Sequence, residues 1–143
     1  MRARFGRLRD GTRNEDGVVT AFVVIITFAL ILMAGLVLDG GLALAGKVQA
    51  IDDAQAAARA GAQAIDLATY RATGQFTLDP AEATTNAEQA LAVAGHTGTL
   101  AVNGDVVTVT VTITQATQIL DIAGIGHMTE TGTGSATAEQ GAP

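Results

Sequence analysis

The sequence predicts an α+β fold in which a long N-terminal helix packs on a small antiparallel sheet, with a second, short helix. Two observations predict the helices: an uncharged apolar run over residues 18–38 leads into an Ala-rich stretch, and a capping signal at Asp79 opens another helical segment. The third observation is a change of period, because apolar and polar residues alternate from about residue 100, as in half-buried strands. At 143 residues the chain is long enough for one such domain.

Residues 18–38 are expected to form a transmembrane helix. The run has 21 residues, of which only Thr20 and Thr27 are polar. A helix of this length spans roughly 31 Å, which matches the hydrocarbon core of a bilayer. A secretory signal peptide is the alternative, because Ala43-Leu44-Ala45 offers an A-x-A cleavage site. Its apolar core is normally only about 7–15 residues, which favours the anchor.

Charge is distributed unevenly around this run and predicts the topology. Residues 1–17 contain five Arg and three carboxylates, whereas residues 39–143 contain three basic residues and eleven carboxylates. Basic residues collect on the cytoplasmic side of a membrane helix. We therefore expect a cytoplasmic basic leader (1–17), the span (18–38) and an extracytoplasmic domain (39–143), with membrane lipid as a partner. An acidic domain of this kind also argues against nucleic-acid binding.

The helical pattern continues from Asp39 to about Thr73, where Gly74 is a suitable C-terminal cap. The residues of one face are small and spaced four apart, which suits a close-packing ridge against either the protein's own sheet or a partner's helix. The alternative is a solvent-facing surface on which Ala occurs only because it is the best helix former. We assign the end near the membrane, at Ala50, to a partner and the end at Ala58 to the sheet. The ridge consists of Gly46, Ala50, Ala54, Ala58 and Ala62.

A second helix is predicted from Asp79 to Gly95. Asp79 is a suitable N-cap, Pro80 suits the first helical position and Glu82 completes a capping box. After Gly95, the pair Asn103-Gly104 predicts a type I′ hairpin turn.

The residues after that turn alternate in character, which predicts the two faces of a sheet. Around the turn Leu100 is expected to face Val107, with Val107–Ile113 apolar on one side and Thr108–Thr114 polar on the other. Residues 119–128 are apolar and predict a short helix or buried loop. Residues 129–138 alternate again, with small residues on the face that the Ala-rich helix would cover.

The chain offers no residue pattern typical of catalysis or metal binding. It has no Cys, and His96 and His127 have no neighbouring ligands in the sequence. Asp52-Asp53 is interpreted as a solvated helix face, and Ser135 lacks the surroundings of a nucleophile. We therefore expect no enzymatic activity, no catalytic residues, no cofactor, no metal and no small-molecule substrate.

Several segments resemble the TadE/TadG-like proteins of the bacterial tight-adherence (Flp) pilus system. They are the Arg-rich leader ending in Gly17, the exit motif Leu36-Val37-Leu38-Asp39-Gly40-Gly41, the Ala-rich stretch 55–62 and the closing run 131–138. The resemblance implies a pilin-like build and a role as a minor pilin, pseudopilin or assembly factor. It also implies helix–helix contacts with other pilus or secretion-system membrane proteins.

The resemblance places a possible processing site between Gly17 and Val18. TadE-type sequences carry a Glu near the fifth residue after the cleavage-site Gly, whereas this chain has Phe22 there. This departure favours a retained anchor over cleavage. Two other functions remain open: a signal-anchored extracytoplasmic binding protein with no pilus partner, and a small secreted domain released by signal peptidase.

Overall fold

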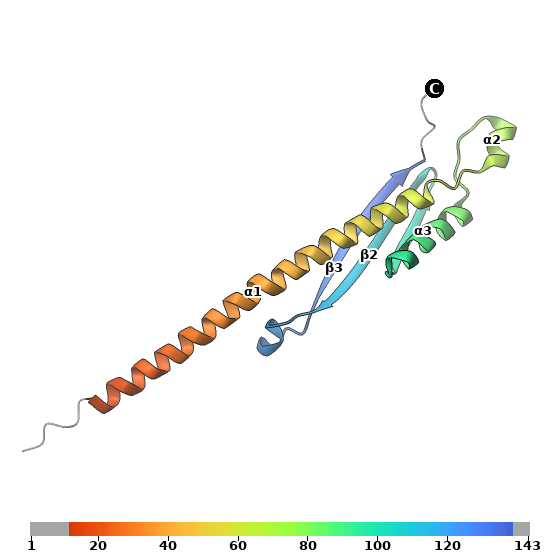
Figure 1. Ribbon diagram of the computed structural model, residues 1–143. Coiled ribbons are helices and arrows are strands. Elements are labelled where there is room, and N and C mark those ends of the chain that lie inside the picture. The colour runs from red at the N-terminus through yellow and green to blue at the C-terminus, as the bar shows by residue number, and fades with distance from the viewer. Residues whose placement is uncertain (1–11, 139–143) are drawn as a thin grey trace, which may run out of the picture.

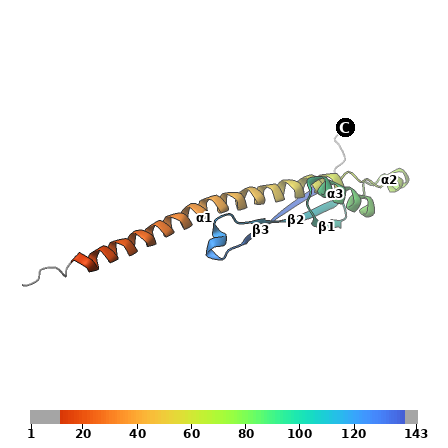
Figure 2. The ribbon, with the colours of Figure 1, turned by 60° about the horizontal axis from the view of Figure 1, so that its bottom comes forward.

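One helix runs through most of the length of the molecule. The computed structural model describes residues 12–138, and its first element is α1, Thr12–Gly61, a helix of 50 residues. At 1.5 Å per residue this helix is about 75 Å long. Its N-terminal half stands clear of all other elements except one short loop, and its C-terminal half carries the rest of the fold (Figure 1). The helix continues through Gly40-Gly41, without a sharp kink in either view (Figure 2).

The helix ends earlier than the sequence predicts. We expected it to continue to about Thr73, but α1 ends at Gly61 and a separate helix, α2, covers Leu67–Thr73. Between them the backbone bonds to a distant segment: the Asp66 N–H donates to the Thr77 carbonyl at 2.9 Å, and the Asp79 N–H donates to the Ala64 carbonyl at 2.9 Å. These tertiary bonds replace the helical ones. Gly74 does cap α2, with φ of 73°.

The second predicted helix is confirmed as α3, Pro80–Ala94. The Asp79 carboxylate accepts the N–H groups of Ala81 and Glu82 at 2.9 and 3.2 Å, and Gly95 ends the helix with φ of 77°. The reciprocal half of the capping box was wrongly predicted, because the Asp79 N–H already donates to Ala64.

The strands form a three-stranded antiparallel sheet in the order β1-β2-β3. They cover Gly98–Asn103, Val106–Ala116 and His127–Thr137. The predicted faces are confirmed: Val107, Val109 and Val111 are fully buried, while the threonines between them face outward. Across β2 and β3 the threonine hydroxyls lie opposite one another in three pairs, 3.2–3.4 Å apart: Thr110–Thr133, Thr112–Thr131 and Thr114–Thr129.

The hairpin turn is displaced by one residue from its predicted place. Asn103 pairs with Val106, so the turn residues are Gly104 and Asp105, and Leu100 pairs with Val109 instead of Val107. Gly104 has φ of 65° and no residue other than glycine has positive φ among those described. A type I′ turn needs positive φ at both central residues, whereas type II′ needs it only at the first. The turn is therefore type II′. Because each β1 residue pairs with a β2 residue two positions later than predicted, the same side chains still point to the same face of the sheet.

Replacing Gly104 with Val is expected to lower the free energy of unfolding by about 1 kcal/mol or more, because a β-branched residue is strained at positive φ. Replacing Asn103 with Thr is the matched control. Asn103 is a strand residue in a type II′ turn, so Thr is tolerated there, whereas a type I′ turn would make that change costly too. Thermal melting of both variants in detergent measures the difference.

The small-residue ridge packs on the protein's own sheet. Ala50, Ala54 and Ala58 are fully buried, and a Cβ atom added to Gly132 of β3 would lie 2.6 Å from the Ala50 carbonyl oxygen. A Cβ on Gly134 would lie 2.6 Å from the Ala54 carbonyl carbon. The assignment of Ala50 to a partner helix was therefore wrong, because β3 covers it. At the two ends, Gly46 lies beside the Gln115 side chain and Ala62 falls just after the helix.

The apolar segment before β3 contains the predicted short helix. It is a 3-10 helix, η1, at Leu120–Ala123. Its chain reverses beside α1, at the end of the sheet nearest the N-terminal half of the helix (Figures 1 and 2). The structure thus places a loop from late in the sequence against the N-terminal helix α1.

Candidate functional site

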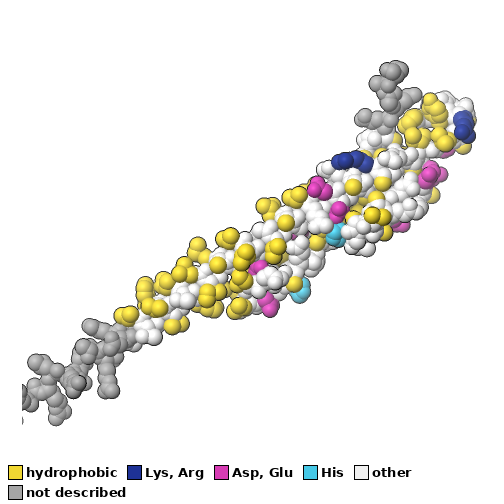
Figure 3. Space-filling model, in the orientation of Figure 1, with side chains coloured by type: hydrophobic (Ala, Val, Ile, Leu, Met, Phe, Trp, Pro, Cys, Tyr) yellow, Lys and Arg dark blue, Asp and Glu magenta, His cyan; other side chains and the backbone are white. Residues whose placement is uncertain are grey.

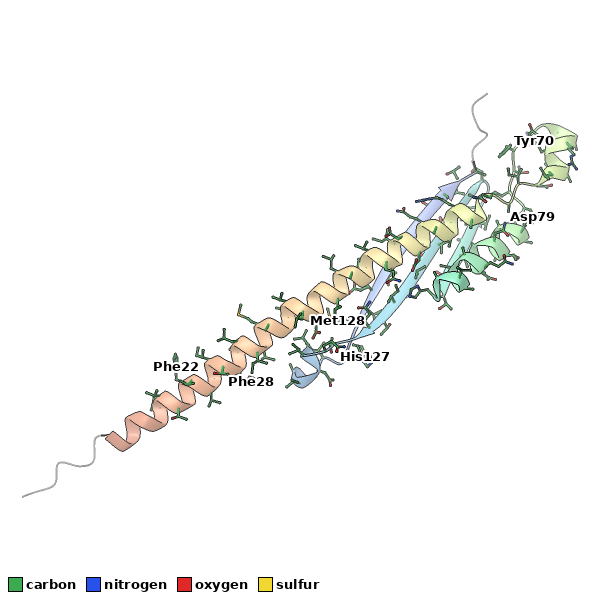
Figure 4. All side chains as sticks on the ribbon, in the orientation of Figure 1. Phe22, Phe28, Tyr70, Asp79, His127 and Met128 are labelled. Carbon is green, nitrogen blue, oxygen red and sulfur yellow. The ribbon has the colours of Figure 1, made fainter. Side chains whose placement is uncertain are left out.

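The N-terminal half of α1 presents an almost continuous apolar surface. Phe22 is 63% exposed and Phe28 50% exposed, and both project away from the helix (Figure 4). Apolar side chains cover this half of the rod, whereas the charged side chains gather over the other half (Figure 3). Exposure of so much apolar surface is unfavourable in water and marks a membrane or partner contact. By length and composition this helix suits a single membrane span or a signal sequence.

A buried carboxylate, Asp39, directly follows the uncharged apolar run 18–38. Its exposed fraction is 2%. One oxygen accepts the Gln118 N–H at 2.8 Å, and the other accepts those of Ile119 and Leu120 at 3.0 and 2.8 Å. Asp39 therefore clamps the loop before β3 to the helix, as an anion that accepts three backbone N–H groups, of which that of Leu120 is buried.

These bonds also determine the acidity of the group. The N–H of Leu120, followed by those of Gln118 and Ile119, lowers the pKa of the Asp39 carboxyl below its ordinary value of 3.8, and the opposite effect of burial does not cancel them. The carboxyl is thus ionised at neutral pH. The stability of the fold therefore depends on pH. The ionised Asp39 carboxylate stabilises the folded state fully above the ordinary pKa, and this stabilisation is lost as the pH falls through the pKa of the folded protein.

Next to the clamp, η1 lies against the apolar half of α1. A Cβ atom added to Gly35 would lie 2.5 Å from Ile119 Cγ2, so only glycine permits this approach. Leu120 and Ala123 line one side of a groove of about 350 Å³, and Ala29, Leu32, Met33 and Leu36 of α1 line the other. The junction between helix and domain is therefore a packed structure.

The possible processing residues, Gly17 and Val18, lie within α1. Both are exposed, and Val18 is 69% exposed. Residues 1–11, most of the leader, lie outside the described residues, so the leader prediction remains a prediction.

The polar residues considered for chemistry are dispersed over the domain. His96 Nδ1 lies 2.8 Å from Asp53 Oδ2, joining the end of α3 to α1, with both side chains about one fifth exposed (23% and 19%). Asp53 is thus partnered within the domain, while Asp52 is exposed as expected. His127 lies at the start of β3, beside Met128 (Figure 4). Among residues 12–138 the structure brings no three His, Asp or Glu side chains together in a metal-binding group.

Sequence reasoning singled out Asp39 only as part of an exit motif and missed its role. Its partners are backbone N–H groups 79–81 positions later in the chain. Backbone donors carry no sequence signal. The one available sign was an acidic residue directly after the apolar run, on the face that later proved to be buried.

A long apolar N-terminal helix packed on a three-stranded antiparallel sheet, with short helices around it, defines a pilin-like α+β architecture. With its exposed apolar half, the chain is built as a membrane-anchored or signal-anchored protein of that class. Comparisons with models of protein families, with curated proteins and with solved structures gave no match.

Proposed function

We propose that this protein is a membrane-anchored structural component, a minor pilin, pseudopilin or assembly factor, of a Tad/Flp-type pilus or related secretion system. The observation that carries the proposal is the division of α1 into two halves. Ala50, Ala54 and Ala58 in the second half are buried under the sheet, whereas the apolar side chains from Val18 to Leu38 are left for the bilayer and for other helices. We infer that the protein meets neighbouring subunits through this part of the helix.

The proposed role requires no chemistry of the protein's own. The anchor lies in membrane lipid with the N-terminus cytoplasmic and the domain outside. Its protein partners are other membrane components of the same machine. Small side chains such as Ala29 and Ala34 lie exposed among the bulky apolar ones and suit helix–helix contacts within the bilayer.

Photo-crosslinking in the native membrane tests this role. A photoreactive phenylalanine analogue at Phe22 or Phe28 places the reactive ring on the exposed face of the span at little structural cost, because Phe is replaced by a close relative. We expect adducts with a pilin or another pilus-assembly protein, identified by mass spectrometry. The matched control is the same analogue at Val93, which is 90% exposed on α3, outside the span.

The outcomes separate the alternatives. Adducts at both Phe positions with a pilus protein, together with loss of surface fibres when the gene is deleted, support the proposal. A protein that remains in the membrane but yields only lipid adducts, with fibres unaffected by deletion, is a signal-anchored protein of another function. A soluble species whose intact mass corresponds to a chain starting at Gly46 identifies a secreted domain. A membrane-bound species whose mass corresponds to a chain starting at Val18 identifies processing after Gly17.

A further inference from the structure

The loop around η1 exposes apolar side chains where a soluble domain would carry polar ones. Ile122 is 69% exposed and Ile125 is 49% exposed, and they lie on either side of the cap Gly124. Between residues 119 and 125 the only charged side chain is Asp121. This small apolar surface is not needed for packing within the chain, because Leu120 alone supplies the buried side chain of η1.

The position of the loop along α1 indicates what covers it. Ile119 packs on Gly35, and Leu120 and Ala123 share a groove with Leu32 and other residues of the apolar run. At 1.5 Å per residue, Gly35 lies about 6 Å and Leu32 about 10 Å further toward the membrane than Asp39. The loop is therefore placed beside residues 29–36, inside the segment proposed to span the bilayer.

The loop is also built to hold its shape without water. The Asp39 carboxylate accepts the N–H groups of residues 118–120. The Ile125 N–H donates to the Leu120 carbonyl at 3.0 Å, and Thr117 bonds through its N–H to the Gly126 carbonyl at 3.1 Å and through its hydroxyl to the Ile125 carbonyl. Backbone groups near hydrocarbon must be satisfied internally in this way.

We propose that residues 119–125 form an apolar wedge that inserts into the outer leaflet beside α1, with Ile122 and Ile125 in contact with lipid. This inference rests on the membrane anchor proposed above. The ligand is the bilayer itself. The Asp121 carboxylate stays at the headgroup level, which makes the insertion shallow. Because the outer domain carries eleven carboxylates and three basic residues, attraction to anionic headgroups does not drive the contact. The wedge is a second attachment, which holds the domain at one height and one rotation relative to the membrane.

The chain contains no Trp, so a single introduced Trp reports on one position only. The full-length protein is reconstituted in phosphatidylcholine bilayers with brominated acyl chains, which quench a Trp that contacts them. Three variants are compared: Ile122→Trp in the wedge, Phe28→Trp in the span and Val93→Trp on α3. We expect Phe28→Trp and Ile122→Trp to lose most of their emission, with a blue-shifted maximum, and Val93→Trp to keep its emission. Bromines placed near the headgroup should quench Ile122→Trp more than bromines deep in the acyl chain.

The controls separate failure of the wedge from failure of the anchor. If Phe28→Trp is quenched and Ile122→Trp is quenched no more than Val93→Trp, the wedge is overturned and the anchor stands. If Phe28→Trp is not quenched, the anchor fails and the wedge with it. Ile125→Trp is a second wedge variant, which replaces Ile122→Trp if that protein melts below the unsubstituted chain. Equal quenching of Ile125→Trp and Val93→Trp likewise overturns the proposal.

Discussion

Replacing Gly132 with Val lowers the free energy of unfolding by about 1–3 kcal/mol, because the added side chain meets the backbone of α1. Even a Cβ atom at this position would lie 2.6 Å from the Ala50 carbonyl oxygen, and backbone atoms cannot move aside as a flexible side chain can. The helix must lift from β3, and the buried contacts of Ala50 and Ala54 are weakened together. For a domain of about 100 residues the melting temperature falls by roughly 4–8 °C per kcal/mol.

The control for this prediction is Thr133→Val on the same strand. Thr133 faces outward, where its hydroxyl lies 3.3 Å from that of Thr110, so the change removes one exposed contact and alters strand propensity little. Its effect should stay within about 0.5 kcal/mol. Thermal melting of both proteins in the same detergent makes the comparison. Equal melting temperatures would show that α1 does not rest directly on β3.

Replacing Asp39 with Asn loosens the junction between the span and the domain. The amide keeps one acceptor oxygen and turns an NH₂ group toward buried N–H donors, so at least one of the three N–H groups of residues 118–120 loses its partner. We expect a lower melting temperature at neutral pH. Hydrogen exchange at residues 118–120 should become faster while the β1–β2 ladder is unaffected.

The stabilisation by Asp39 should weaken at low pH. The folded pKa of Asp39 is lowered, so its contribution is complete above the ordinary value of 3.8 and is lost as the pH falls through the folded value. The difference in melting temperature between the unsubstituted protein and Asp39→Asn should therefore shrink as the pH is lowered from about 5 to about 2. Asp66 also has a lowered pKa, chiefly from the Thr69 hydroxyl, but it is present in both proteins and cancels in the difference. Asp52→Asn, an exposed carboxylate on the same helix, is the control; a difference that does not change with pH would contradict the clamp.

The clamp, the close contact of helix and sheet, and the proposed wedge act on the same element. Gly132 and Gly134 hold the second half of α1 to β3, and Asp39 holds its middle to the loop before β3. A helix attached along this length transmits any tilt of the span to the whole domain. This rigidity suits the structural role proposed above.

The features that depend only on residues close together in the chain were predictable from the sequence. The run 18–38 predicts a membrane-spanning helix because such a helix needs about 20 consecutive apolar residues. The ends of α3 are readable from Asp79, Pro80 and Gly95, because caps act within one turn of helix. The buried and exposed faces of β2 and β3 are predicted by the alternation of apolar or small residues with polar ones. A shift of the strand pairing by two residues leaves these faces unchanged.

Other features depend on contacts between residues far apart in the chain, and these became visible only in the folded protein. The end of α1 at Gly61 depends on the bonds of residues 64–66 to residues 77–79, which helical periodicity cannot show. The choice of a type II′ over a type I′ turn depends on the full pairing of β2 with β1 and β3, not on Asn103-Gly104 alone. Whether the ridge met a sheet or a partner was open because small side chains suit both. The glycines of β3 decided it, since the absence of Cβ atoms at Gly132 and Gly134 is what lets the sheet reach the helix backbone.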